Sequence, residues 1–179
     1  MVEPALSKER IEKLIEAAGE LLTGDWVLVG GALAALWFSP ARVTVDVDLV
    51  ALTDHPDRRY ELMDFALAQG LPLETVNSAA DFFLRRVPGW ADHLELLHAG
   101  TRARVFRPTP TLFLILKSGR MSEADLEDCI GLLAEAERTG MPVDGEGVLS
   151  HLAGLPAPES EGAALRRERL RGALGRRAG

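Results

Sequence analysis

The sequence lacks the features that mark secreted, membrane-spanning or disulfide-stabilised proteins. Among 179 residues there is one cysteine, Cys129, so no internal disulfide is possible and a reducing compartment is expected. No apolar run approaches the roughly 20 residues that a membrane span needs. The first residues lack the cationic and apolar segments of a secretory signal. We therefore expect a cytoplasmic protein with no membrane partner.

Several common patterns of catalysis and cofactor binding are absent as well. The four histidines show no metal-ligand spacing with one another or with the cysteine, so zinc is not expected. The dinucleotide fingerprint G-x-G-x-x-G and the P-loop lysine are missing. No Ser/His/Asp elbow supports nucleophilic hydrolysis. Any phosphate site in this chain is therefore of another kind.

Charge of one sign is in excess, and it is unevenly distributed. The net charge is −7, which argues against a general nucleic-acid coat. From Glu159 onward six arginines face three glutamates, a net of +3, which leaves −10 for the rest of the chain. We expect this basic segment to be a solvated terminal helix. The alternative is that it contacts RNA, an acidic partner or the acidic body itself.

Hydrophobic periodicity, caps and turn residues predict an α+β chain whose C-terminal half is helical. Helices are expected from the caps Ser7, Thr109 and Ser122, and over 32–38, 54–70 and 163–174. Strands are expected over 26–29, 43–52, 73–76, 82–87, 92–98 and 102–106. Pro88-Gly89 predicts a tight turn that joins 82–87 and 92–98 in an antiparallel hairpin.

Three segments follow from this pattern. Residues 1–107 are expected to form an α/β core with an N-terminal helix. Residues 108–153 form a helical C-terminal subdomain. Residues 154–179 contain a Pro/Gly/Glu-rich linker and the basic terminal helix.

Two carboxylates one residue apart, Asp46 and Asp48, are the strongest chemical signal. Residues i and i+2 of a strand point to the same face, so both negative charges are expected at one spot. Such a pair repels unless a cation lies between the two groups. The alternative is that both acids lie on the solvent face of an amphipathic strand.

A glycine pair, Gly30-Gly31, precedes these acids by one short helix. The pair follows a buried strand and opens that helix, and free backbone N–H groups at a helix N-terminus bind anions. The alternative is a plain tight turn with close packing. Metal and phosphate sites beside each other would indicate nucleotide chemistry.

Together these motifs resemble the nucleotidyltransferase superfamily with the DNA polymerase β fold. The similarity is greatest to the branch of AbiEii-type toxins and related uncharacterised bacterial proteins. Its fold is a mixed sheet flanked by helices, with a helical C-terminal part. The resemblance covers about residues 26–133 and rests on Gly30-Gly31-Ala32, Arg42-x-Thr44-x-Asp46-x-Asp48, Lys117-x-x-Arg120 and Asp125-x-x-Asp128.

The resemblance implies that Asp46 and Asp48 hold Mg²⁺ or Mn²⁺ bridging the phosphates of an NTP. Gly30 and Gly31 would let the backbone approach those phosphates. Contacts with the phosphates or the nucleotide are implied for five further residues: Arg42, Thr44, Lys117, Arg120 and Asp128. Most of them have an alternative. Arg42 can be a surface charge, Thr44 a residue that suits a strand, and Lys117 a favourable cation at a helix C-terminus. Asp128 can pair with Lys117 or Arg120. Many relatives carry Ser where this chain has Ala32, which removes one phosphate hydrogen bond of about 1 kcal/mol.

A third carboxylate is implied for the second metal and for activation of the attacking hydroxyl. Glu95 is preferred because Leu94 and Leu96 flank it, as in a half-buried strand, and Asp92 is the alternative. Either can instead be an ordinary exposed acid. Two-metal transfer requires one of them beside Asp46 and Asp48. The third acid therefore separates a catalyst from a binding protein.

The expected function is metal-dependent transfer of an NMP group from an NTP to an RNA, such as a tRNA, or to a protein. The resemblance also implies a toxin of a toxin–antitoxin system, with an antitoxin as partner. One alternative is an inactive protein of the same fold that binds a nucleotide or a partner. Another is a small structural module of a larger complex that docks through its basic tail.

Overall fold

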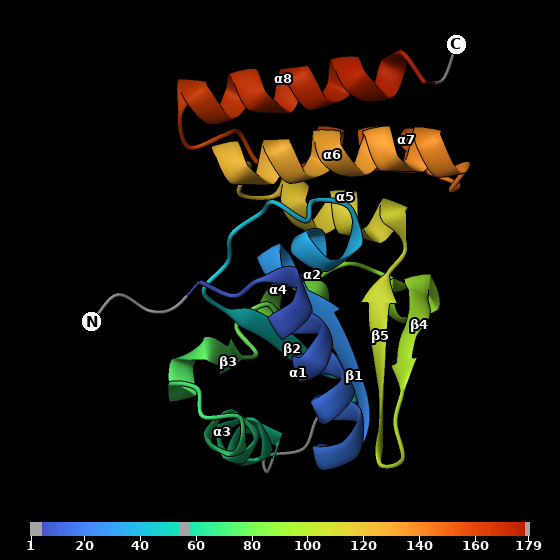
Figure 1. Cartoon of the computed structure of the whole chain (residues 1–179). Helices are drawn as coiled ribbons and strands as arrows, with labels where there is room; N and C mark the ends of the chain where they lie inside the picture. Colours follow the sequence, from blue (N-terminus) through green and yellow to red (C-terminus); the bar gives the residue numbers. More distant parts are fainter. Residues whose placement is uncertain (1–4, 54–57, 178–179) are drawn as a thin grey trace. The chain divides into compact units, whose positions relative to one another are not determined.

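The structure is a computed structural model that describes residues 5–53 and 58–177 (Figure 1). The chain divides into two compact units, residues 1–108 and 109–179. The sequence placed the corresponding boundary at residues 107/108. No helix within the described residues is both long enough and apolar enough to cross a bilayer.

The first unit contains a five-stranded mixed sheet with helices. Strand β1 is central, and the strand order is β3-β2-β1-β5-β4. Pairs β1/β2 and β4/β5 are antiparallel, whereas β1/β5 and β2/β3 are parallel. In chain order the elements are α1 Lys8–Leu21, β1 Gly24–Val29, α2 Gly30–Trp37, β2 Val47–Ala51, α3 Arg58–Ala68, the 3-10 turn η1 Leu73–Thr75, β3 Val76–Asn77, α4 Asp81–Leu84, the 3-10 turn η2 Trp90–His93, β4 Leu94–Ala99 and β5 Ala103–Pro108.

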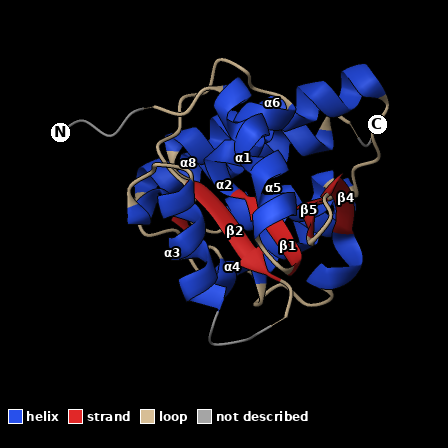
Figure 2. Cartoon of the chain, turned by 60° about the horizontal axis from the view of Figure 1, so that its bottom comes forward, coloured by secondary structure: helices blue, strands red, loops and turns tan. Residues whose placement is uncertain are grey.

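The core of this unit forms around β1 and β2, which lie side by side in Figure 2. Residues 26–29 and 49–50 are buried, as a continuous apolar run predicts for a central strand. Because the two strands are antiparallel, the end of β1 meets the start of β2, and Val29 lies opposite Asp48. This pairing brings the helix that follows Val29 to the acid-bearing strand.

The N-terminal helix α1 shows how local signals place an element. The Ser7 hydroxyl accepts a hydrogen bond from the Arg10 backbone N–H and caps the helix. Ile11, Leu14 and Ala18 are buried on one face, as their spacing predicts. Leu21, the last residue of the helix, is 42% exposed, whereas the next residue, Leu22, is buried.

Three predicted strands differ from the observed elements. Residues 82–87 were expected to form a strand, but α4 begins at Asp81, whose carboxylate pairs with Arg85 one turn later. The expected hairpin around Pro88-Gly89 is therefore absent, and the antiparallel hairpin is β4/β5 instead. Residues 73–75 form η1, and only 47–51 of the expected 43–52 belong to strand β2. The predicted helix over 54–70 is α3; its expected start lies outside the described residues.

The second unit consists of helices α5 Pro110–Ser118, α6 Glu123–Thr139, α7 Gly145–Gly154 and α8 Glu161–Gly175. Thr109 and Ser122 cap α5 and α6, and Ser122 forms a capping box with Asp125. Helix α7 was not predicted, because its sequence contains three glycines. Asp144 caps it, and burial of Val148 and Leu152 stabilises it.

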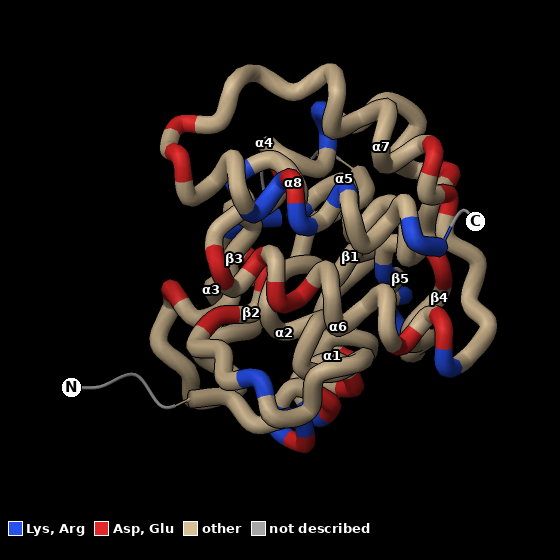
Figure 3. The backbone as a smooth tube through the Cα atoms, turned by 90° about the horizontal axis from the view of Figure 1, so that it is seen from above, with Lys and Arg blue, Asp and Glu red and all other residues tan. Residues whose placement is uncertain are grey.

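The basic C-terminal segment bonds to its own unit. Arginines gather along α8, which packs on α6 and α7 (Figure 3). Arg167 is 6% exposed and donates to the carbonyl oxygens of Pro156 (2.7 Å) and Gly119 (2.9 Å). Other arginines of this segment also donate to backbone carbonyls of the second unit: Arg166 to Met121, Arg171 to Leu152 and Arg177 to Leu133. The segment is thus more than a solvated helix, because much of its charge caps backbone oxygens.

Candidate nucleotide site

The two acids singled out in the sequence flank the start of β2. Asp48 is the second residue of this strand, and Asp46 immediately precedes it. Both are half-buried, whereas Val47 between them is fully buried. This alternation places Asp46 and Asp48 on the side of the chain opposite to Val47. The start of β2 therefore presents two carboxylates, although the regular strand begins only after Asp46.

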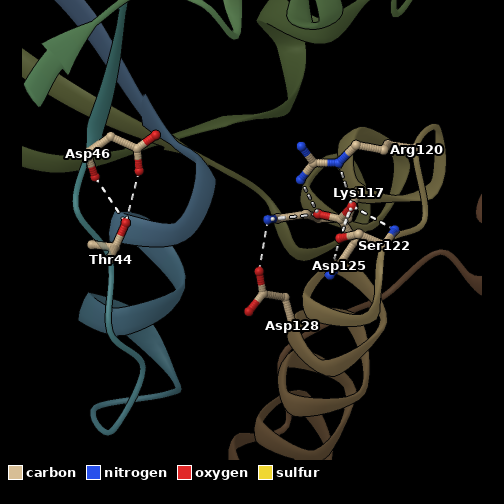
Figure 4. Close-up of polar contacts among 7 residues, drawn as sticks. All are labelled: Thr44, Asp46, Lys117, Arg120, Ser122, Asp125 and Asp128. Carbon is tan, nitrogen blue, oxygen red and sulfur yellow. Dashed lines mark hydrogen bonds and ion pairs between the residues drawn. The ribbon is translucent and has the colours of Figure 1, made fainter. Parts of the chain in front are cut away.

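Thr44 lies against the first of these acids. Its hydroxyl is 3.0 Å from Asp46 Oδ1 and 3.2 Å from the Asp46 carbonyl oxygen, and it can donate to either (Figure 4). The backbone N–H of Leu6 donates to the Thr44 carbonyl oxygen at 2.8 Å. Thr44 is only 7% exposed, so its hydroxyl is fixed beside Asp46.

Gly30 provides close contact between the backbone and the second acid. A Cβ at this position would lie 2.4 Å from Asp48 Oδ2, closer than two such atoms can approach. The residue also has φ +76°, a conformation that side chains disfavour. Glycine is therefore favoured at position 30 twice, by its backbone conformation and because a Cβ would displace the Asp48 carboxylate.

Gly31 is covered by the two remaining residues of the motif. A Cβ there would lie 3.2 Å from Thr44 Oγ1 and 3.3 Å from both Nε and Nη2 of Arg42. The structure thus brings six predicted site residues to the start of α2 and β2. They are Gly30, Gly31, Arg42, Thr44, Asp46 and Asp48, which we call the β2 cluster.

The β2 cluster contains charges of both signs around a helix N-terminus. Helix α2 begins at Gly30 after Val29, whose side chain offers no oxygen to cap it. Its first N–H groups and the Arg42 guanidinium are positive, which favours an anion. The carboxylates of Asp46 and Asp48 favour a cation. A metal–phosphate complex satisfies both requirements.

The residues present fit a magnesium ion carried by a nucleotide. Proteins bind Mg²⁺ through one or two carboxylates together with substrate phosphates, rather than through a cage of protein ligands alone. Asp46 and Asp48 provide that number of carboxylates. Among the described residues, no three His, Cys, Asp or Glu side chains gather as a metal site by themselves.

Glu95, the preferred third carboxylate, lies elsewhere on the sheet. It belongs to edge strand β4, which is separated from β2 by β1 and β5, or about 14 Å at the usual strand spacing. Asp48 lies opposite Val29, and Val27, two residues earlier, shares its face. Val27 lies opposite Phe106, and Phe106 opposite Leu96, so Leu96 is on the same face as Asp48. Glu95 is next to Leu96 and therefore points to the other face.

Glu95 also has a partner on that other face. Its Oε2 is 2.9 Å from Arg107 Nη2, and the Arg107 guanidinium lies 3.8 Å from the ring centre of Trp37. The alternative acid, Asp92, is exposed in η2 before β4 begins. The fold therefore does not bring Glu95 to the β2 cluster, and no third carboxylate joins Asp46 and Asp48 among the described residues.

The remaining predicted residues form a second cluster within the helical unit. Lys117 Nζ is 3.3 Å from Asp125 Oδ1 and 2.8 Å from Asp128 Oδ2. Arg120 Nε is 3.0 Å from Asp125 Oδ2 (Figure 4). The three central side chains are buried, with exposures of 11% for Lys117, 4% for Asp125 and 2% for Asp128. We call these four residues the Lys117 cluster.

Asp125 belongs to the capping box with Ser122, and the structure gives it further partners. Its Oδ2 accepts hydrogen bonds from the Ser122 hydroxyl (2.7 Å) and backbone N–H (3.0 Å), in addition to Arg120. Burial acts to raise the pKa of Asp125, but the bonds from Arg120 and Ser122 and the charge of Lys117 lower it well below its usual range. Asp125 is therefore ionised and neutralised inside its unit.

Cys129 is also buried in this part of α6, and burial raises the pKa of its thiol to about 12. Sequence reasoning assigned Lys117, Arg120 and Asp128 but omitted Asp125 from the site. To predict the ion pair between Lys117 and Asp125 from the sequence, one would have had to know that α5 packs against α6.

Comparisons with known proteins bear on the fold. No protein-family model matches the sequence, and no curated protein matches it either. A solved structure does match: the crystal structure of an antigenic nucleotidyltransferase-like protein from Paracoccidioides brasiliensis, with a TM-score of 0.54 and 15% identity. The match covers 96% of this chain and 95% of the other chain.

This chain has a nucleotidyltransferase-like fold. The predicted fold class, a mixed sheet flanked by helices with a helical C-terminal part, is therefore confirmed. In this nucleotidyltransferase-like fold, the start of β2 combines paired carboxylates with the glycine-opened helix α2. The fold itself does not identify a reaction, which has to be argued from the site.

Proposed function

We propose that the protein is a metal-dependent nucleotidyltransferase that moves an NMP group from an NTP to an RNA or protein acceptor. The supporting observation is the β2 cluster, in which Asp48 packs on Gly30 while Arg42 and Thr44 pack on Gly31. Two carboxylates, one guanidinium and a helix N-terminus at one place match the mixed charge of a metal-bound triphosphate.

In this proposal, each residue of the β2 cluster has a separate task. Asp46 and Asp48 would hold Mg²⁺ or Mn²⁺, and a bound ion supplies neutralisation of phosphate charge. Thr44 orients the Asp46 carboxylate through its hydroxyl. Gly30 and Gly31 allow phosphates to approach the backbone, and Arg42 binds a phosphate oxygen. Positioning and charge neutralisation account for most of the catalysis in such transfers.

A second function is favoured by the position of Glu95. Its pairing with Arg107 on the opposite face leaves the β2 cluster without the third acid that two-metal transfer needs. A protein with this cluster can bind a nucleotide without transferring it. The second candidate is therefore a nucleotide-binding or partner-binding module with a nucleotidyltransferase-like fold.

The finer aspects of the sequence-based hypothesis belong to the same proposal. A toxin role, an antitoxin partner, membership of the AbiEii-type branch and a cytoplasmic location all rest on the sequence resemblance. Lys117, Arg120 and Asp128 as nucleotide contacts stay predictions, since ion pairs within their own unit account for their positions.

Calorimetry tests the binding step shared by both candidates. Titration with each NTP, with and without Mg²⁺, is expected to show metal-dependent binding that Asp46→Asn or Asp48→Asn abolishes. Asp81→Asn is the matched control, because Asp81 is a half-buried acid of the same unit that pairs with Arg85. Unchanged affinity in Asp46→Asn and Asp48→Asn would exclude both nucleotide functions at this site.

Transfer is tested separately with α-labelled NTPs. The protein is incubated with each NTP and total RNA, and in parallel with protein lysate. Label that enters one of these pools and is lost in Asp48→Asn supports the transferase. Metal-dependent binding without incorporation supports the binding module. Glu95→Gln is expected to leave incorporation unchanged, because Glu95 pairs with Arg107 on the opposite face. Loss of incorporation with an intact fold would show that Glu95 acts as the third metal ligand.

A further inference from the structure

Two adjacent phenylalanines of the first unit are exposed to solvent. Phe82 is 55% exposed and Phe83 is 60% exposed, although both belong to helix α4. By contrast Phe65, Phe113 and Trp26 are at most 2% exposed. Burying a large apolar side chain contributes about 1.5–3 kcal/mol, so leaving two neighbouring rings in water requires an explanation.

Arginines accompany these rings. The Arg86 guanidinium lies 3.8 Å from the ring centre of Phe82, within the range of a cation–π contact. The Phe82 and Phe83 rings are 5.4 Å apart and nearly perpendicular, at 88°. Each ring therefore faces a different direction. We call Phe82, Phe83 and Arg86 the aromatic surface.

The aromatic surface lies beside the strand that carries the β2 cluster. Arg85 Nη2 donates to the carbonyl oxygen of Ala51 at 2.9 Å, and Ala51 is three residues beyond Asp48, or about 10 Å along a strand. On the other side, Asn77 lies opposite Asp48 in the β2/β3 pair, four residues before α4 begins. The Arg85–Ala51 hydrogen bond and the short connection from Asn77 therefore place α4 near the β2 cluster.

We propose that the aromatic surface binds unpaired bases of a single-stranded nucleic acid. The two nearly perpendicular rings provide separate faces for stacking, and the Arg86 guanidinium, which covers one face of Phe82, adds a cation on which a base can also stack. A stable protein interface buries about 800 Å² on each partner, whereas these two rings belong to a helix of four residues and are accompanied by the charged Asp81, Arg85 and Arg86. Duplexes are excluded, because their bases are already stacked.

This surface would present the acceptor strand to the β2 cluster, a role that rests on the proposed function. Binding of the strand does not rest on it and is measured without nucleotide or metal. Because stacking supplies the recognition, both RNA and DNA strands are expected to bind, and the acceptor is identified by comparing the two. The net charge of −7 disfavours attraction to phosphates, so a strand that binds here has to be held by stacking on the rings.

Fluorescence anisotropy with labelled 12-nucleotide single strands of RNA and of DNA tests the proposal on the full chain. Phe82→Leu and Phe83→Leu keep the apolar bulk but remove the ring, and each is expected to weaken binding about 5- to 100-fold. Arg86→Gln is expected to weaken it less. Tyr60→Leu is the matched control, because Tyr60 is a 66% exposed aromatic on α3 of the same unit.

Several results would overturn the proposal. They are unchanged affinity in both phenylalanine variants, equal binding of the matching duplex, or no single-strand binding by the wild-type protein. Loss of Mg-NTP affinity in Phe82→Leu would instead assign the rings to the nucleotide base. Asp48→Asn is expected to keep its single-strand affinity, so failure of the proposed transferase can be distinguished from failure of this surface.

Discussion

The two acidic clusters of this protein differ in how their charges are balanced. The carboxylates of Asp46 and Asp48 are half-buried at the start of β2 and lie beside a helix N-terminus. Those of Asp125 and Asp128 are almost fully buried and lie within 3.3 Å of one lysine nitrogen. Removing one partner of a buried ion pair is costly, because it leaves an uncompensated buried charge, whereas accessible carboxylates beside glycines can accept a ligand. The same residue types thus indicate structure in one region and binding in the other.

The largest effect is expected from removing the charge at the centre of the Lys117 cluster. Lys117→Met leaves two buried carboxylates without their shared cation, and breaking such a group costs about 3–5 kcal/mol of unfolding free energy. Urea unfolding followed by circular dichroism measures this loss. Lys13→Met, at an exposed position of α1, is the control. Wild-type stability combined with weaker NTP binding would show that Lys117 is a ligand-binding residue instead.

A pair of glycine variants separates backbone strain from the contact with Asp48. Gly30 and Gly70 both have positive φ, so alanine at either site costs about 1–2 kcal/mol. Only at Gly30 would the new Cβ meet Asp48, because nothing lies within 4 Å of a Cβ at Gly70. We expect Gly30→Ala alone to abolish Mg-NTP binding in calorimetry. Equal affinity in the two variants would show that the glycine–Asp48 contact has no role in binding.

The Lys117 cluster also predicts how stability depends on pH. The pKa of Asp125 is lower in the folded protein than the value of about 3.9 in an unfolded chain. Its contribution to stability is therefore present above about pH 4 and is lost as the pH falls toward the folded pKa. The difference in unfolding free energy between wild type and Asp125→Asn is expected to shrink from pH 5 to pH 2.5. A constant difference would mean that Asp125 is not stabilised as an anion.

The smallest effect is expected at the edge of the same cluster. The Arg120 side chain is 77% exposed, so its pair with Asp125 is screened by solvent. Arg120→Gln is expected to lower the unfolding free energy by less than about 1 kcal/mol. A loss as large as that of Lys117→Met would show that exposure does not decide the strength of these pairs. Thermal unfolding of the two variants side by side provides the measurement.

Much of the local structure could be predicted from short sequence signals. Ser7, Thr109 and Ser122 cap helices as expected, because each hydroxyl reaches a backbone N–H three residues later. The contact between Gly30 and Asp48 was also foreseeable, since only a short helix separates them. The prediction of a strand over residues 82–87 was wrong. The bulky side chains of this segment favour strands, but its start forms a helical turn that the Asp81–Arg85 pair stabilises.

The sequence by itself determined the caps, the buried strand β1 and the proximity of Gly30 and Gly31 to Asp46 and Asp48. These features depend on contacts over a few residues or across one antiparallel pair. Only the tertiary structure decided that β5 lies between β1 and β4, which places Glu95 far from Asp48 and on the other face. It also decided that Asp125 joins the Lys117–Asp128 pair that the sequence had suggested, and that both acids are buried. Strand order and helix pairing depend on packing between distant segments, and no local spacing encodes them.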